Sequence, residues 1–133
     1  MSSTRSTLAA IALTFSAMLV GAAPVAAQTQ APATQQVPLI EPAQVRGLIA
    51  LGGKITIVDV RRPDETAQGT IPGAILMPLD NLPNTFSALP KKGKLIVYCR
   101  SGHRSAQAVQ FLLDHGYKNA VSMNGGYLAW TQH

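Results

Sequence analysis

The chemistry in this sequence centres on Cys99, the only cysteine among the 133 residues. The short apolar run between Lys94 and Cys99 predicts a buried strand, and the spacing of apolar residues after Ser105 predicts a helix. Cys99 is therefore expected at a strand-to-helix turn. A thiol in that position faces the positive end of the helix dipole, which favours its ionised form.

The residues that follow Cys99 are suited to holding an anion. Gly102 allows the backbone to turn so that successive N–H groups point toward one spot, and two arginines add positive charge. These features should lower the pKa of Cys99 from about 8.5 into the range of about 3.5–7.5 that activated cysteines show. The alternative, an inert buried thiol, is disfavoured by the flanking arginines. We expect Cys99 to be the nucleophile and the following loop to bind substrate through Arg100, Ser101, Gly102, His103, Arg104 and Ser105.

Four motifs in this chain resemble those of a single-domain rhodanese. They are DVRRPDE (59–65), GTIPGA (69–74), CRSGHRS (99–105) and NGGYLAW (124–130), and the resemblance runs from about Leu39 to Gln132. It implies that Cys99 takes the sulfane sulfur of a donor such as thiosulfate, carries it as a persulfide and passes it to cyanide or a thiol. Thr70 and Ala67 depart from the family, which commonly has a histidine and an aromatic residue there. Because the histidine is not the sulfur carrier, the implied reaction class is unchanged.

Two other functions compete with sulfur transfer. Cysteine phosphatases and arsenate reductases hold oxyanions in a loop of the form C-x5-R, but here Arg104 is the fifth residue after Cys99 and Ser105 is the sixth. The shorter loop suits a single sulfur better than a phosphate. The second alternative is a non-catalytic persulfide carrier or an interaction module for an exported partner. A protein acceptor for the sulfur is compatible with either the enzyme or the carrier.

Composition narrows the choice of partners. The net charge is +5, but only 13% of residues are charged and the basic residues are scattered, apart from a cluster at 91–94. This argues against nucleic-acid binding, which needs a clustered basic stripe, and favours small anionic substrates. The three histidines lack ligand spacing with Cys99 or with one another, so no metal and no cofactor are expected.

The N-terminal segment has the pattern of a signal peptide. Arg5 supplies positive charge, Leu8 to Val20 form an apolar core, and Ala27 ends a small-residue cleavage site. We expect removal of residues 1–27, a periplasmic or secreted product, and no stable membrane contact afterwards. A lone cysteine in such an oxidising compartment has no partner for an internal disulfide, which favours a reactive thiol.

The remainder divides into a flexible linker at 28–38 and one rhodanese-like domain at 39–133. The residues of the run 54–60 are apolar on both alternations, which indicates a strand covered on both faces. Strands that alternate with helical stretches predict an α/β fold, with a central, mostly parallel sheet of about five short strands flanked by helices on both faces. Other expected elements are a helix from Pro42 to Gly52, a helical turn at 66–69, strands at 75–77 and 121–123, and helices at 84–88 and 127–130.

Two further side-chain roles can be predicted. Asp59 and Arg61 lie at the end of a strand, where ligands often bind, but charged residues beside a turn more often pair structurally. We expect Asp59 to bond loop backbone and Arg61 or Arg62 to pair with nearby acids. Trp130 is expected in the core.

Overall fold

The computed structural model describes Gly21 and residues 36–132. Its strands form one sheet in the order β1-β5-β4-β2-β3, and every pairing is parallel. The strands are β1 (Leu39–Ile40), β2 (Ile55–Asp59), β3 (Ile75–Leu76), β4 (Lys94–Tyr98) and β5 (Ala120–Met123). The predicted parallel sheet of five short strands is therefore confirmed. Apart from Gly21, the predicted signal peptide lies outside the described residues, as do all but the last three residues of the predicted linker.

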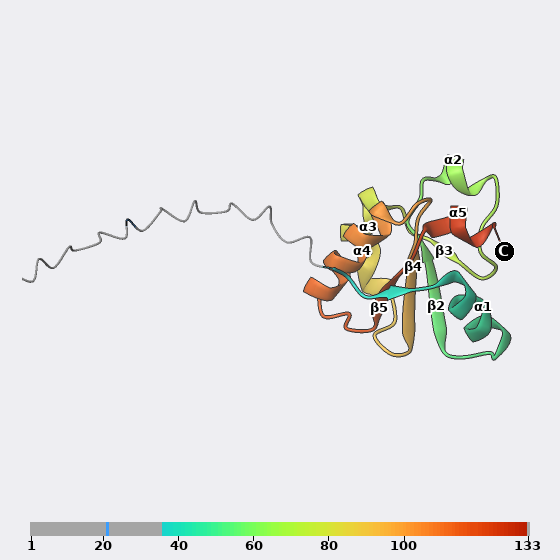
Figure 1. Ribbon diagram of the computed structural model, residues 1–133, viewed down its shortest axis with the longest axis horizontal. Helices are drawn as coiled ribbons and strands as arrows, with labels where there is room; N and C mark the ends of the chain where they lie inside the picture. Colours follow the sequence, from blue (N-terminus) through green and yellow to red (C-terminus); the bar gives the residue numbers. More distant parts are fainter. Residues whose placement is uncertain (1–20, 22–35, 133) are drawn as a thin grey trace, which may run out of the picture. The chain divides into compact units, whose positions relative to one another are not determined.

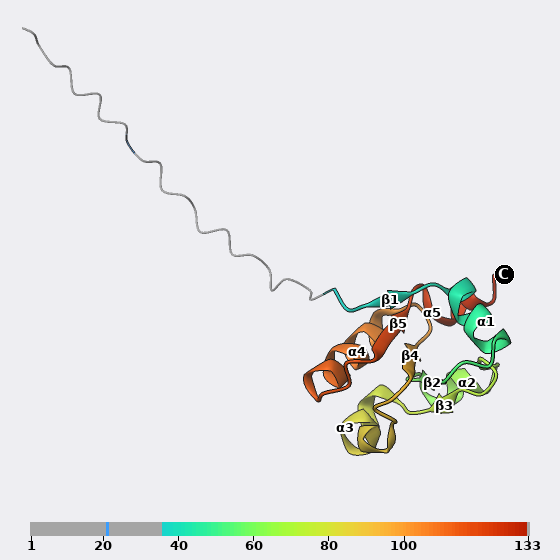
Figure 2. The same ribbon diagram turned by 90° about the horizontal axis from the view of Figure 1, so that it is seen from below.

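Helices cover both faces of this sheet, as the alternation of strands and helices predicts (Figures 1 and 2). Helices α3 (Leu82–Thr85) and α4 (His103–Asp114) lie on one side, while α1 (Pro42–Ala50) and α5 (Gly126–Trp130) lie on the other. The short helix α2 (Pro63–Thr66) follows β2 directly. Both layers pack on the central strands, so the domain has two apolar cores separated by the sheet.

Strand β4 shows how the sequence builds these two cores. Leu95, Val97 and Cys99 belong to the core beneath α4, whereas Ile96 and Tyr98 belong to the core beneath α1. Successive side chains of a strand point to opposite faces, so an unbroken apolar run is what a strand with two covered faces requires. Cys99 is thus part of a core and directly follows a strand that is buried from Leu95 to Tyr98.

Several short elements differ from the predictions. Strand β1 has no separate prediction, because two residues carry no periodic pattern. The helical turn predicted at 66–69 is wrong by three residues, since Pro63 fixes the start of α2. Helix α4 begins at His103, before Ser105, and α3 is flanked by 3₁₀ turns at 79–81 and 86–88.

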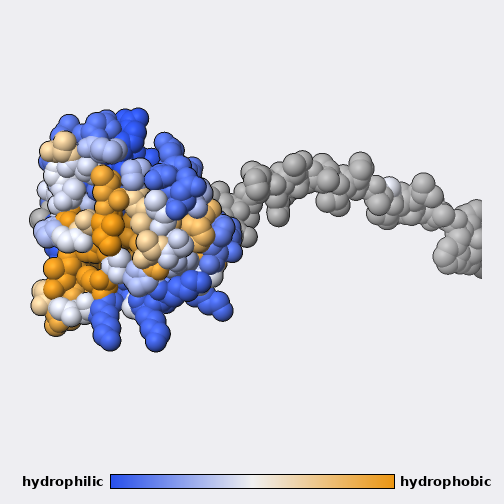
Figure 3. Space-filling model, turned by 180° about the vertical axis from the view of Figure 1, so that it is seen from behind, coloured by the Kyte–Doolittle hydropathy of each residue, from blue (hydrophilic) through white to orange (hydrophobic). Residues whose placement is uncertain are grey.

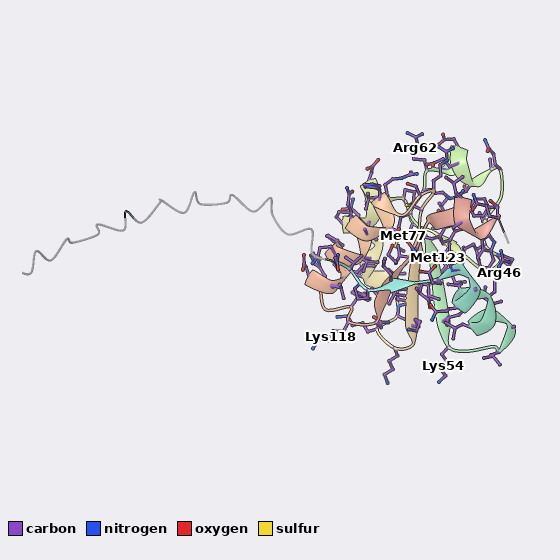
Figure 4. All side chains as sticks on the ribbon, in the orientation of Figure 1. Arg46, Lys54, Arg62, Met77, Lys118 and Met123 are labelled. Carbon is purple, nitrogen blue, oxygen red and sulfur yellow. The ribbon has the colours of Figure 1, made fainter. Side chains whose placement is uncertain are left out.

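The surface combines apolar and hydrophilic regions (Figure 3), and the basic side chains of Lys54, Arg62 and Lys118 are exposed at its periphery (Figure 4). Apolar colour gathers in the lower left part of the face shown in Figure 3, and the edge strand β3 exposes both Ile75 and Leu76. Trp130 is half-buried, so the prediction of a core position is only partly correct. Over the described residues, the longest helices fall short of the length and apolar character needed to cross a bilayer.

Candidate active site

Cys99 directly follows β4 and begins the loop that leads into α4. The loop turns at Gly102, whose φ is 106°. Residues other than glycine adopt this left-handed backbone region only at a steric cost. Only 1% of Cys99 is exposed. The predicted strand-to-helix turn is therefore present, with the thiol held at the floor of the loop.

Hydrogen-bond donors of the loop converge on the sulfur of Cys99. The amide of Gly102 donates to Sγ at a distance of 3.0 Å, and the hydroxyl Oγ of Ser105 lies 3.6 Å from Sγ. Burial acts to raise the pKa of the Cys99 thiol, but hydrogen bonds from the Ser105 hydroxyl and from the amides of Ser105, Gly102 and Ser101 outweigh it. The pKa of Cys99 is therefore lowered, as the sequence predicts, and hydrogen bonds are the main cause.

The hydroxyl of Ser105 is fixed by two further contacts. Beside the protonated thiol, the hydroxyl accepts from Sγ and donates to the carbonyl of Gly102 at 3.1 Å, and it lies 2.8 Å from the hydroxyl of Ser122 on β5. Both serines are buried. Sequence analysis missed the contact between Ser122 and Ser105. The apolar pattern of β5 does not indicate that its one serine lies beside the loop that follows β4.

We expect Ser105→Ala to raise the pKa of Cys99, because it removes the hydroxyl whose hydrogen bond with the sulfur lowers that pKa. The pH dependence of Cys99 alkylation by iodoacetamide measures this pKa, and its midpoint should move to higher pH. Ser122→Ala is the matched control, since it removes an equally buried hydroxyl that does not reach Sγ. Equal midpoints in wild type and Ser105→Ala would contradict this role.

Helix α5 holds the other side of the loop. The amide of Tyr127 donates to the carbonyl of Cys99 at 2.7 Å, and the amide of Leu128 donates to the carbonyl of Arg100 at 3.0 Å. A side chain on Gly126 would meet these same carbonyl groups at about 2.5 Å. The α5 amides therefore bind the loop carbonyls on one side, while the amides of Ser101 and Gly102 face the sulfur on the other.

The structural roles predicted for Asp59 and Arg61 are confirmed, with a different pairing. Asp59 accepts from the backbone amide of Arg61 over 3.0 Å and pairs with the guanidinium of the same residue at 2.7 Å. Arg61 also donates to the carbonyl of Gly69 and lies 4.3 Å over the ring of Tyr127. The neighbouring Arg62 makes the predicted surface pairs with Asp64 and Glu65. The buried pair thus packs behind α5, which in turn holds the loop.

Arg104 contributes positive charge near Cys99, as the sequence analysis expects, but its guanidinium is hydrogen-bonded to a carboxylate. Its guanidinium donates to both carboxylate oxygens of Glu65 on α2, at distances of 2.6 and 2.7 Å. Sequence analysis missed this pair, because the two residues are 39 positions apart. The hydrogen bonds from Arg104, reinforced by Arg62, lower the pKa of Glu65 to about 2. The ion pair ties α2 to the start of α4.

This ion pair should make stability fall in acid. The folded-state pKa of Glu65 is about 2, below its ordinary value of 4.5, so the stabilisation is fully present above about pH 4.5 and is lost as the pH falls toward about 2. Allowing for partial exposure, we expect the loss to be on the order of 1–2 kcal/mol. Urea unfolding of wild type and Glu65→Gln at about pH 6 and about pH 3 measures it. The variant should show a smaller drop, and equal drops would contradict the prediction.

A cavity of about 490 Å³ opens over this loop. Its charged lining comprises three arginines and two carboxylates, Arg62, Arg100, Arg104, Glu65 and Asp80. Ser101 and apolar side chains, including Leu79 and Leu128, complete it, and a second cavity of about 450 Å³ adjoins it across Arg100 and Leu128. His103 is exposed and does not line this cavity. The cavity is therefore bordered by α2, the Cys99 loop and α5, and of the predicted site residues it is lined by Arg100, Ser101 and Arg104.

The comparisons with known proteins agree with this architecture. A family model described as the rhodanese-like domain matches residues 41–133. A sulfurtransferase of Allochromatium vinosum is 42% identical over 79 residues, which cover 59% of this chain and 74% of that protein. The human thiosulfate:glutathione sulfurtransferase is 33% identical over 109 residues, covering 71% of this chain and 94% of that protein. The crystal structure of a rhodanese-related protein from Thermoplasma volcanium superposes with a TM-score of 0.66 at 34% identity, covering 71% of this chain and 91% of that one. The chain belongs to the family of rhodanese-like domains, and the relatives that it matches by sequence are sulfurtransferases.

Proposed function

We propose that this protein is a sulfurtransferase that moves a sulfane sulfur from thiosulfate, or a similar anionic donor, to cyanide or a thiol through a persulfide on Cys99. The observation that supports this most directly is the convergence of the Gly102, Ser101 and Ser105 amides on the sulfur. Such a ring of N–H groups stabilises first a thiolate and then the terminal sulfur of a persulfide, which is also an anion.

In the first half-reaction the Cys99 thiolate attacks the outer sulfur of thiosulfate. A bond forms between Sγ and that sulfur, the bond between the two thiosulfate sulfurs breaks, and sulfite leaves with the electron pair. In the second half-reaction cyanide or a thiolate attacks the terminal sulfur of the persulfide, and the Cys99 thiolate is released. Arg100, Ser101 and Arg104 line the cavity through which the anions arrive. Because Cys99 is only 1% exposed, a donor with a slender terminal sulfur fits best.

The test is the intact mass of the purified protein, measured after thiosulfate and again after cyanide or a small thiol. We expect the gain of one sulfur atom at Cys99 and then its loss, together with double-displacement kinetics. Gain without loss to any small acceptor would favour a carrier that serves a protein acceptor. No gain with thiosulfate or with any other sulfane donor would overturn the proposal.

We also propose that the protein is exported and loses residues 1–27, on the sequence pattern of its first segment. Export would place the reactive thiol in a periplasmic or extracellular compartment. N-terminal sequencing of the protein recovered from that compartment tests this, with Gln28 expected first. A first residue before Gln28 would contradict the assignment.

A further inference from the structure

The cavity beside the Cys99 loop is lined by carboxylates as well as by arginines. Arg104 is the cation nearest the start of α4, and both arms of its guanidinium are held by Glu65. The carboxylate of Glu65 is 18% exposed and that of Asp80 also borders the cavity. An incoming anion therefore meets negative charge beside two of the three arginines, since Glu65 also lies 3.8 Å from Arg62.

We propose that Glu65 is a specificity-determining residue, which acts through Arg104 to disfavour doubly charged sulfur donors relative to singly charged ones. This inference rests on the proposed function and concerns the donor class that the same site prefers. The donors favoured are thiosulfonates and organic persulfides, whose reacting ends carry one negative charge. Glu65 is a positioning residue, because it touches Arg104 and not the reacting sulfur.

The physical reason is the dependence of Coulomb energy on charge. The repulsion between Glu65 and a donor is proportional to the charge of the donor, so it is twice as large for a dianion. The same carboxylate also occupies the planar fork that would otherwise bind two oxygens of a sulfonate end in a bidentate way. Both effects weaken binding of thiosulfate more than binding of a monoanion.

Thiosulfate and methanethiosulfonate form a suitable pair of probes. Both present a terminal sulfane sulfur, but methanethiosulfonate has a methyl group in place of one anionic oxygen and carries one charge less. Transfer from it forms the same bond to Sγ and breaks its bond between the two sulfurs, with methanesulfinate as the leaving group. A difference between the two donors therefore reports charge and not a change in reaction type.

The experiment measures single-turnover persulfide formation by wild type and Glu65→Gln at low salt. Glutamine keeps an oxygen that can accept from the Arg62 amide at the start of α2, so the fold should be retained. We expect the half-saturating concentration to fall roughly tenfold for thiosulfate and roughly threefold for methanethiosulfonate. The saturating rate should change less than about twofold, because Glu65 donates nothing to Sγ.

Asp114→Asn is the matched control, because it changes the net charge equally at the far end of α4, about 15 Å along the helix from Arg104. Asp114 contacts only Gln110 among the hydrogen bonds of the described residues. Glu65→Asp keeps the charge and should retain most of the preference for monoanionic donors. Higher salt should reduce the effect of Glu65→Gln.

Three results would overturn the inference while leaving the proposed function intact. They are unchanged half-saturation in Glu65→Gln, equal changes for both donors, and an equal change in Asp114→Asn. Absence of persulfide formation by wild type with either donor would instead remove the proposed function and the inference together.

Discussion

Cys99→Ser should abolish the proposed sulfur transfer and leave the domain folded. The hydroxyl that replaces the thiol stays protonated at neutral pH and cannot store a sulfane sulfur, so the half-reactions lose their only carrier. Serine is close in size to cysteine, and the donors around position 99 offer its oxygen hydrogen bonds. We expect the unfolding free energy to change by about 1 kcal/mol. Formation of thiocyanate from thiosulfate and cyanide measures the activity, and thermal unfolding measures the fold.

Cys99→Ala provides the second variant for this prediction, since it lacks any hydroxyl that could act in place of sulfur. Both variants should give the rate of the uncatalysed reaction, and neither should gain mass after thiosulfate. Retained transfer by a folded Cys99→Ser protein would show that sulfur is carried elsewhere or not at all.

Gly126→Ala should have the second-largest effect, because this position allows α5 to approach the Cys99 loop. An added methyl group would lie 2.5 Å from the carbonyl carbon and oxygen of Arg100 and 2.6 Å from the carbonyl oxygen of Cys99. Backbone atoms cannot rotate away as a side chain can, and φ at Gly126 is 61°. We expect a loss of about 3 kcal/mol or more and, in any protein that folds, a displaced loop with a higher pKa of Cys99.

Gly73→Ala is the control that separates the steric clash with the Cys99 loop from the energetic cost of a positive φ in alanine. Gly73 also has a positive φ, of 80°, but an added Cβ there meets nothing within 4 Å. That variant should lose only about 1–2 kcal/mol and keep its activity. Denaturant unfolding and the pH dependence of alkylation measure both variants. If the two were equally stable, the close approach of α5 would be of no importance.

The sequence allowed the framework of the site to be predicted because its signals are local. The β-branched run before Asp59 and the apolar run before Cys99 each specify a buried strand, and Gly102 specifies the turn that follows. A thiol between a parallel strand and a helix follows from those three signals alone. The resemblance to rhodaneses adds the reaction class, and the family match confirms membership.

The contacts that tune the site could not be predicted in this way, because they join residues that are distant in the sequence. Glu65 reaches Arg104 only after α2 and α4 have been placed by the sheet between them. Ser122 reaches Ser105 because β5 pairs with β4, and the register of that pairing is not written in either strand. Tyr127 and Leu128 lie in the helix predicted at 127–130, but nothing in the sequence indicated that their amides support the loop or that Leu128 is exposed at the cavity.

The support that α5 gives the loop also orders events during synthesis of the protein. Cys99 leaves the ribosome before Gly126, Tyr127 and Leu128 have been added, so the carbonyls of Cys99 and Arg100 have no helix amides to bind at that stage. A nascent polypeptide that stops short of α5 therefore lacks two of the backbone hydrogen bonds that hold the Cys99 loop. The loop reaches the arrangement described above only when α5 has been added.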